Sequence, residues 1–165
     1  LRHYRAINRH NRIQLMDALI DLLIHYGYWG MLTSALLAGS ILPFSSEAVM
    51  LGLMAAGLNP WQLALYGTIG NVAGSMFNYG IGRLGKPEWV EKYLHVKQES
   101  LDKAERFMAG RGAWMGFFAF LPVIGSAITV SLGLMRANAI ITLTSVTLGK
   151  IVRYVLLIYG VSLFF

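Results

Sequence analysis

Residues 41–49 read ILPFSSEAV, and residues 120–128 read FLPVIGSAI. The two segments align without gaps, and they share a Leu-Pro pair and an alanine five residues after the proline. Each proline, Pro43 in the first segment and Pro122 in the second, lies between two short apolar runs. Because proline interrupts a helix, each segment predicts a break between two short helices.

The apolar runs beside the two prolines are too short to cross a membrane alone. At 1.5 Å per residue the first two are about 18 and 16 Å long, roughly half of a 30 Å hydrocarbon core. The four runs are Met31 to Leu42, Ala48 to Leu58, Ala113 to Leu121 and Val123 to Met135. We therefore expect two re-entrant helical hairpins with Pro43 and Pro122 at their tips.

A longer apolar run follows each hairpin. Trp61 to Gly82 has 22 residues and Ala137 to Gly160 has 24, and each exceeds the ~20 residues that a membrane crossing needs. Gly70-Asn71 in the first run corresponds to Gly149-Lys150 in the second. One hairpin plus one crossing makes an odd number of passes, so two such repeats would lie inverted in the membrane, an arrangement typical of transporters. Two ordinary helical pairs with proline kinks are the alternative.

The composition excludes a water-soluble domain. Of the 165 residues, 56% are hydrophobic and 13% are charged, whereas soluble domains have about 45–50% and about 25%. Ala48 to Gly82 and Gly112 to Met135 contain no Lys, Arg, Asp or Glu. We therefore expect an all-α integral membrane protein that forms a single domain.

The basic residues lie outside or at the edges of the apolar runs. The formal net charge of +6 therefore suits a membrane surface better than nucleic acid, for which the sequence has no binding signature. Ile13 to Gly30 has a helical period and would lie on the membrane or cross it. Gly85 to Gly110 predicts two short amphipathic helices in the interface. The expected parts are a basic arm with its helix (1–30), repeat 1 (31–82), an amphipathic connector (83–111) and repeat 2 (112–160).

Glu47 carries the only formal charge between Asp21 and Arg83. A carboxylate at the centre of a bilayer costs several kcal/mol unless it is protonated, hydrated or paired. The functional interpretation is a group that binds a proton or pairs with a cation. The alternative is a structural carboxylate that accepts hydrogen bonds from free backbone N–H groups at a broken helix.

Lys150 and Arg153 lie 13 and 16 residues into the second long run. These positions correspond to about 20 and 24 Å along a helix that must cover about 30 Å. At a spacing of i, i+3 they share a helix face, where they could bind an anionic headgroup or pair with Glu47. The alternative is that the last helix starts later and both side chains snorkel to an interface.

Arg83 and Asn71 are further candidates for substrate binding. Arg83 ends the first long run, where an arginine usually snorkels to the interface. Asn71 and Asn78 are one heptad apart and can line one interior face, although Asn in a membrane helix is often a hydrogen-bonding contact between helices.

The sequence offers no support for an enzyme. It contains no cysteine, no glycine-rich nucleotide loop and no recognisable serine, histidine and carboxylate set. His25 and His95 have no second histidine at a metal-ligand spacing. We therefore expect no enzyme activity, no metal site and no cofactor, although coupling to a proton gradient is compatible with Glu47.

Several short motifs follow one another between Gly27 and Gly160. They are Leu-Pro-x-x-x-Glu at the first hairpin, Gly70-Asn71-x-x-Gly74, Tyr79-Gly80-x-Gly82-Arg83, Phe107-Met108-x-Gly110-x-Gly112 and the Phe-Leu-Pro of the second hairpin. Their order and spacing resemble those of the DedA family, which shares the VTT domain of eukaryotic lipid scramblases. The ending Leu148-Gly149-Lys150-x-x-Arg153-Tyr154 is similar to the small YqaA-type branch.

This resemblance implies a multi-pass protein of the bacterial inner membrane with two re-entrant hairpins. It also implies the movement of lipids such as undecaprenyl phosphate, linked to the proton gradient. Glu47 matches the hairpin acid of the family, and Arg83 matches the arginine that closes the first crossing. The usual arginines three residues before and three after the second hairpin proline are replaced by Ala119 and Gly125, and an acid that precedes the hairpin acid by about twelve residues is replaced by Ala35.

We therefore expect a flippase or scramblase-like transporter for an anionic lipid, such as undecaprenyl phosphate or a phospholipid. Lys150 and Arg153 would replace the absent family arginines at the headgroup, and Glu47 would bind the proton. The expected partners are membrane lipids and no nucleic acid, and a homo-oligomer is left open. The alternatives are a cation/proton antiporter centred on Glu47 and a structural membrane protein without transport activity.

Overall fold

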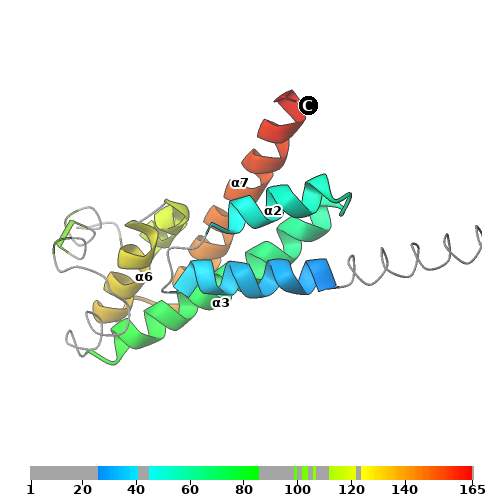
Figure 1. The fold of residues 1–165 in the computed structure, drawn as a ribbon. Helices are drawn as coiled ribbons and strands as arrows, with labels where there is room; N and C mark the ends of the chain where they lie inside the picture. Colours follow the sequence, from blue (N-terminus) through cyan, green and yellow to red (C-terminus); the bar gives the residue numbers. More distant parts are fainter. Residues whose placement is uncertain are drawn as a thin grey trace, which may run out of the picture.

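The computed structural model describes residues 26–40, 45–85, 112–121 and 124–164, together with residues 99, 102, 103 and 106. Every element within these ranges is a helix. In chain order they are the 26–40 helix, α2 (Ser46–Ala55), α3 (Pro60–Arg83), the 3-10 helix η1 (Gly112–Phe120), α6 (Ile124–Leu134) and α7 (Ala139–Phe164), drawn in Figure 1.

Some of the predicted features lie outside the described residues. These are the two hairpin tips at Pro43 and Pro122, most of the Ile13 to Gly30 helix and nearly all of the Gly85 to Gly110 connector. The re-entrant geometry of the hairpins and the amphipathic connector therefore stay predictions.

The two long runs are confirmed as long helices, and an asparagine caps each of them. The Asn59 side chain accepts hydrogen bonds from the backbone N–H groups of Trp61 (2.9 Å) and Gln62 (3.3 Å) at the start of α3. Asn138 caps α7 in the same way. An Asn at this position satisfies N–H groups that have no partner inside the helix. With 24 and 26 residues, the helices are about 36 and 39 Å long.

Within the described residues, one segment is both long and apolar enough to cross a membrane, Ala139–Leu163 of α7. Helix α3 is nearly as long, but it carries buried Thr68, Asn71, Ser75 and Asn78, which lower its hydropathy. A crossing by α3 therefore stays a prediction that rests on its length.

The second hairpin differs from the expectation in its first arm. Ala113 to Leu121 was expected as a short helix in an all-α protein, and the structure has the 3-10 helix η1 there. A 3-10 helix is narrower and rises about 2 Å per residue, so its backbone can approach a neighbour closely. A side chain at Gly149 of α7 would overlap the Phe117 carbonyl oxygen, which shows that η1 and α7 are in backbone contact.

The order of elements recurs, and so does the turn that ends each short helix. Gly57 after α2 and Arg136 after α6 both have a positive φ, 93° and 51°. Two residues later come the capping residues Asn59 and Asn138. The same sequence spacing separates Pro43 from Pro122, Gly57 from Arg136 and Gly70 from Gly149. The similarity between the two halves therefore extends well beyond the two nine-residue segments.

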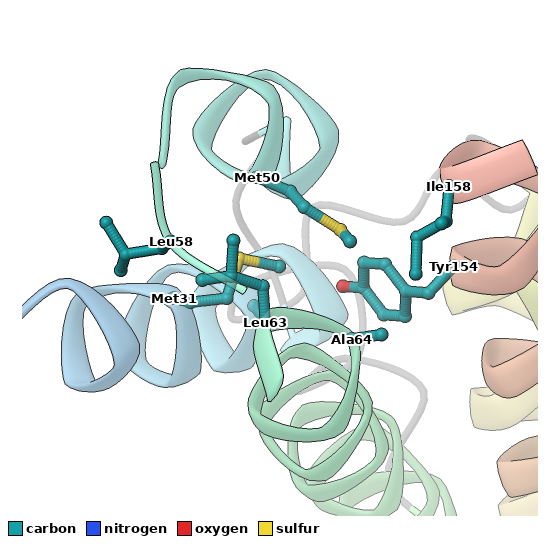
Figure 2. Close-up of a cluster of buried hydrophobic side chains, with 8 residues drawn as sticks. Met31, Met50, Leu58, Leu63, Ala64, Tyr154 and Ile158 are labelled. Carbon is teal, nitrogen blue, oxygen red and sulfur yellow. The ribbon is translucent and has the colours of Figure 1, made fainter. Parts of the chain in front are cut away.

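Helix α6 packs closely on α3, and α2, which also packs on α3, reaches α7 through side-chain contacts. Met50 of α2 shares a core with Tyr154 and Ile158 of α7, and Figure 2 shows its side chain directed toward both. Likewise, Ile128 of α6 shares a core with Tyr79 of α3. These contacts join the two halves and place the start of α2 beside the middle of α7.

The contact between α3 and α6 predicts a large difference between two neighbouring glycines. A Cβ at Gly82 would overlap the Val130 carbonyl oxygen, whereas a Cβ at Gly80 would have no atom within 4 Å. We expect Gly82→Ala to destabilise the protein by about 2 kcal/mol through overpacking. Gly80→Ala should stabilise it by up to about 1 kcal/mol, because Ala favours the helix.

Thermal unfolding of both variants in detergent micelles measures the difference. Equal midpoint temperatures for Gly82→Ala and Gly80→Ala would contradict the close backbone approach of α3 and α6.

Candidate functional site

The carboxylate of Glu47 lies at the start of α2 and forms an ion pair with Arg153 of α7. Ser45, the N-cap of α2, accepts a hydrogen bond from the Ala48 N–H (3.2 Å), and its hydroxyl donates to Glu47 Oε2 (3.1 Å). The N-terminal end of a helix favours a negative charge. The two charged side chains are each 24% exposed, so the pair is mostly withdrawn from solvent.

Lys150 and Arg153 both point from α7 to the end of η1. Lys150 Nζ donates to the Ala119 carbonyl (2.8 Å), and Arg153 donates to the Phe120 carbonyl (2.7 Å). The last carbonyls of a helix have no partner inside it, and here two cations supply the hydrogen bonds. The two residues thus share a face as predicted, but they contact protein groups in this structure instead of forming an open fork.

Lys150 is the more unusual of the two cations. Its side chain is buried, with 4% exposure. Among the described residues the ion pairs are Arg153 with Glu47 and Lys103 with Glu99, so Lys150 has no described carboxylate within pairing distance. Burying a charged ammonium group without a paired carboxylate costs free energy, and Lys150 buries one beside the end of η1.

A buried polar chain lies next to the ion pair. Asn71 donates to the Tyr154 hydroxyl (3.4 Å), which donates to the Ser46 hydroxyl (3.1 Å). The Asn71 Oδ1 atom is buried without a hydrogen-bond partner in the described structure. Figure 2 shows the Tyr154 ring reaching from α7 into the space between α2 and α3. Asn71 therefore does not contact the charged residues itself, but it binds Tyr154, which is next to Arg153 in the chain.

The end of the 26–40 helix is held in a comparable way. Asn78 of α3 donates to the carbonyls of Gly39 (3.1 Å) and Ser40 (2.7 Å). In both halves a side chain from the long helix therefore binds the last carbonyls of the arm before the hairpin tip. The two halves differ in the charge of the donor. A neutral amide donates to the carbonyls of the first arm, and a lysine and an arginine donate to those of the second.

Arg83 lies apart from this site. It is exposed at the end of α3 and donates to the Tyr79 hydroxyl (2.7 Å), which donates to the Ala137 carbonyl (2.5 Å). The structure thus brings together Glu47, Lys150 and Arg153, with Asn71 close by, and places Arg83 elsewhere. Within the described ranges no three His, Asp or Glu side chains are grouped as metal ligands.

Sequence reasoning missed Ser46 and Tyr154. Tyr154 belongs to the final motif, but no role was predicted for it. The available signal was a hydroxyl directly after Arg153 and one helical turn after Lys150. Ser46 precedes Glu47 at a helix start, where serine is usually assigned to capping.

Removing the Tyr154 hydroxyl is expected to cost about 1–2 kcal/mol of stability, because Tyr154→Phe leaves the buried Asn71 and Ser46 groups without their shared partner. Tyr159 is on the same helix, 57% exposed, and its ring contacts Trp61. Tyr159→Phe should therefore leave the unfolding temperature unchanged. A similar effect of both substitutions in a thermal unfolding assay would show that the buried chain does not stabilise the fold.

Comparison with known proteins agrees with the motifs. Residues 42–163 match the VTT domain. An uncharacterised protein of Haemophilus influenzae is 31% identical over 140 residues, covering 78% of this chain and 83% of that protein. The inner membrane protein YqaA of Escherichia coli is 27% identical over 128 residues, covering 77% and 85%.

A further relative carries a functional name. Undecaprenyl phosphate transporter A of Bacillus subtilis is 35% identical over 74 residues, which cover 42% of this chain and 37% of that protein. No solved structure matches the chain. The VTT domain match covers most of the chain, and the protein therefore belongs to the DedA family of membrane proteins, as its motifs predicted.

Proposed function

We propose that this protein moves an anionic lipid across the bacterial inner membrane. The observation that carries the proposal is Lys150, a buried cation without a described carboxylate partner in a helix that can cross a membrane. An intramembrane cation of this kind fits a mobile anionic ligand. Support also comes from the relative named for undecaprenyl phosphate transport. The headgroup of that lipid is a phosphate.

The ion pair between Glu47 and Arg153 suggests how a proton would be coupled to this movement. A phosphate and the Glu47 carboxylate would compete for Arg153, since both are anions that arginine binds bidentately. Protonation of Glu47 removes its charge and releases Arg153, which then joins Lys150 in binding the headgroup. Loss of the proton restores the ion pair and expels the lipid phosphate.

The proposed transport path runs between two inverted halves. Their support is the recurring order of elements and the contacts of α6 with α3 and of α2 with α7. Lys150 is 11 residues from the start of α7, or about 17 Å along the helix, close to the middle of a 30 Å core. In this arrangement both hairpins are re-entrant and the chain crosses the membrane several times.

The test is reconstitution of the protein in liposomes that contain a trace of labelled phosphatidylglycerol or labelled phosphatidylcholine. We expect protein-dependent movement of the anionic phosphatidylglycerol between leaflets, and much slower movement of the zwitterionic phosphatidylcholine. A parallel assay with an internal pH dye and a sodium or potassium gradient detects antiport. Cation-driven proton movement without lipid movement would replace this proposal with the antiporter, and inactivity in both assays would favour a structural protein.

A further inference from the structure

The turn between α6 and α7 contains an arginine in a conformation that favours glycine. Arg136 has a φ of 51°. Its N–H donates to the Gly133 carbonyl (2.9 Å), and the Ala137 N–H donates to the Leu132 carbonyl (3.0 Å). This pair of hydrogen bonds is a common helix ending, and glycine usually occupies the left-handed position. The corresponding turn after α2 has Gly57 there.

Arg136 is one of the residues that line an open pocket of about 450 Å³ at the start of α7. Arg83, from the end of α3, lines the same pocket. Among the described residues neither arginine has a carboxylate within pairing distance. An arginine thus occupies an unfavourable backbone conformation at a position that lines the same pocket as Arg83.

Hydrogen bonds fix the position of the Arg83 side chain. The hydrogen bond from Arg83 to Tyr79, and from Tyr79 to Ala137, ties the arginine to the α6–α7 turn. The Asn138 side chain already accepts from the first N–H groups of α7. The N–H groups of Ile140 and Ile141 are therefore already used, and the two arginines are the charged donors that line the pocket. Two guanidinium groups suit a phosphate, because each guanidinium can bind a phosphate bidentately.

The surroundings of the pocket favour a lipid phosphate over a free anion. Large apolar side chains beside the two arginines are exposed, namely Leu84 (62%), Met135 (52%) and Ile140 (75%). Because α7 begins here and is apolar enough to cross a membrane, the pocket would lie where the hydrocarbon meets the headgroups. A basic pocket with an apolar rim matches a headgroup with its acyl chains.

We propose that Arg83 and Arg136 form a surface site for the phosphate of an anionic membrane lipid. The site is separate from Glu47, Arg153 and Lys150, since the start of α7 is about 17 Å from Lys150 along the helix. It binds lipid whether or not the protein transports it.

The test measures binding of labelled phosphatidic acid to the purified protein in uncharged detergent. Arg136→Gly and Arg83→Gln should each weaken binding at least about tenfold, because each removes a charge-assisted contact to the phosphate. Arg136→Gly should also keep or raise the unfolding temperature, since glycine suits the turn. The same losses are expected in a Lys150→Met background, which separates this pocket from the proposed transport site.

Two controls test whether binding depends on these two arginines and on the lipid. Lys103→Gln removes one exposed positive charge outside the pocket and should leave binding unchanged. Inorganic phosphate should compete poorly with phosphatidic acid. Unchanged binding by Arg136→Gly, or an equal loss in Lys103→Gln, would overturn the site, and effective competition by inorganic phosphate would overturn its assignment to a lipid.

Discussion

Arg153→Met is expected to destabilise the protein by about 3 kcal/mol and to abolish lipid transport. The value is at the lower end of the range for breaking a buried ion pair, because each side chain keeps 24% exposure. The substitution leaves the Glu47 carboxylate without its cation and the Phe120 carbonyl without its donor. Denaturant unfolding in detergent micelles measures the stability, and reconstituted liposomes measure the transport.

The double variant Glu47→Leu, Arg153→Met separates the structural part of this effect from the functional part. Without a carboxylate to desolvate, it should recover much of the lost stability. It should remain inactive, because Arg153, which would bind the headgroup phosphate, is absent. Stability losses that simply add in the double variant would contradict a direct interaction between the two side chains.

Lys150→Met is expected to reduce transport of an anionic lipid at least about tenfold with no loss of stability. The substitution removes the hydrogen bond to the Ala119 carbonyl, but it also removes the desolvation cost of a buried charge, and the two effects offset each other. Methionine retains an unbranched apolar stem of similar length. A tenfold rate change corresponds to about 1.4 kcal/mol in the barrier.

Lys103→Met provides the matched control for that variant. Lys103 pairs with Glu99 in an exposed position, so its loss should change neither transport nor stability. Full transport by Lys150→Met would show that this lysine only stabilises the end of η1. A large loss of stability in Lys150→Met would likewise assign it a structural role.

The long helices could be predicted from sequence because local signals mark their ends. Asn59 and Pro60 mark the start of α3, and the structure places it at Pro60–Arg83 where Trp61 to Gly82 was expected. The 3-10 form of η1 could not be predicted in this way. It depends on close contact with α7 at Gly149, which is a property of the packed helices and not of residues 112–120.

The charged centre was predictable in part. Glu47, Lys150 and Arg153 were identified because charge is rare in apolar runs, and pairing of Glu47 with a cation was one of the alternatives. Which cation takes the carboxylate depends on the position of α2 beside α7, so sequence could not distinguish Arg153 from Lys150. Arg136 was missed because its significance lies in a backbone conformation, φ 51°, that only the structure shows.

The pH profile of anionic-lipid transport, measured side by side for the wild type and Glu47→Gln, tests whether the ion pair between Glu47 and Arg153 controls transport. If a phosphate and the Glu47 carboxylate compete for Arg153, wild-type transport should rise as the pH falls, because protonation releases the arginine. Glu47→Gln cannot form the ion pair, and its transport should be active and should depend less on pH than wild-type transport. The same pH dependence in both proteins would show that the ion pair does not control transport.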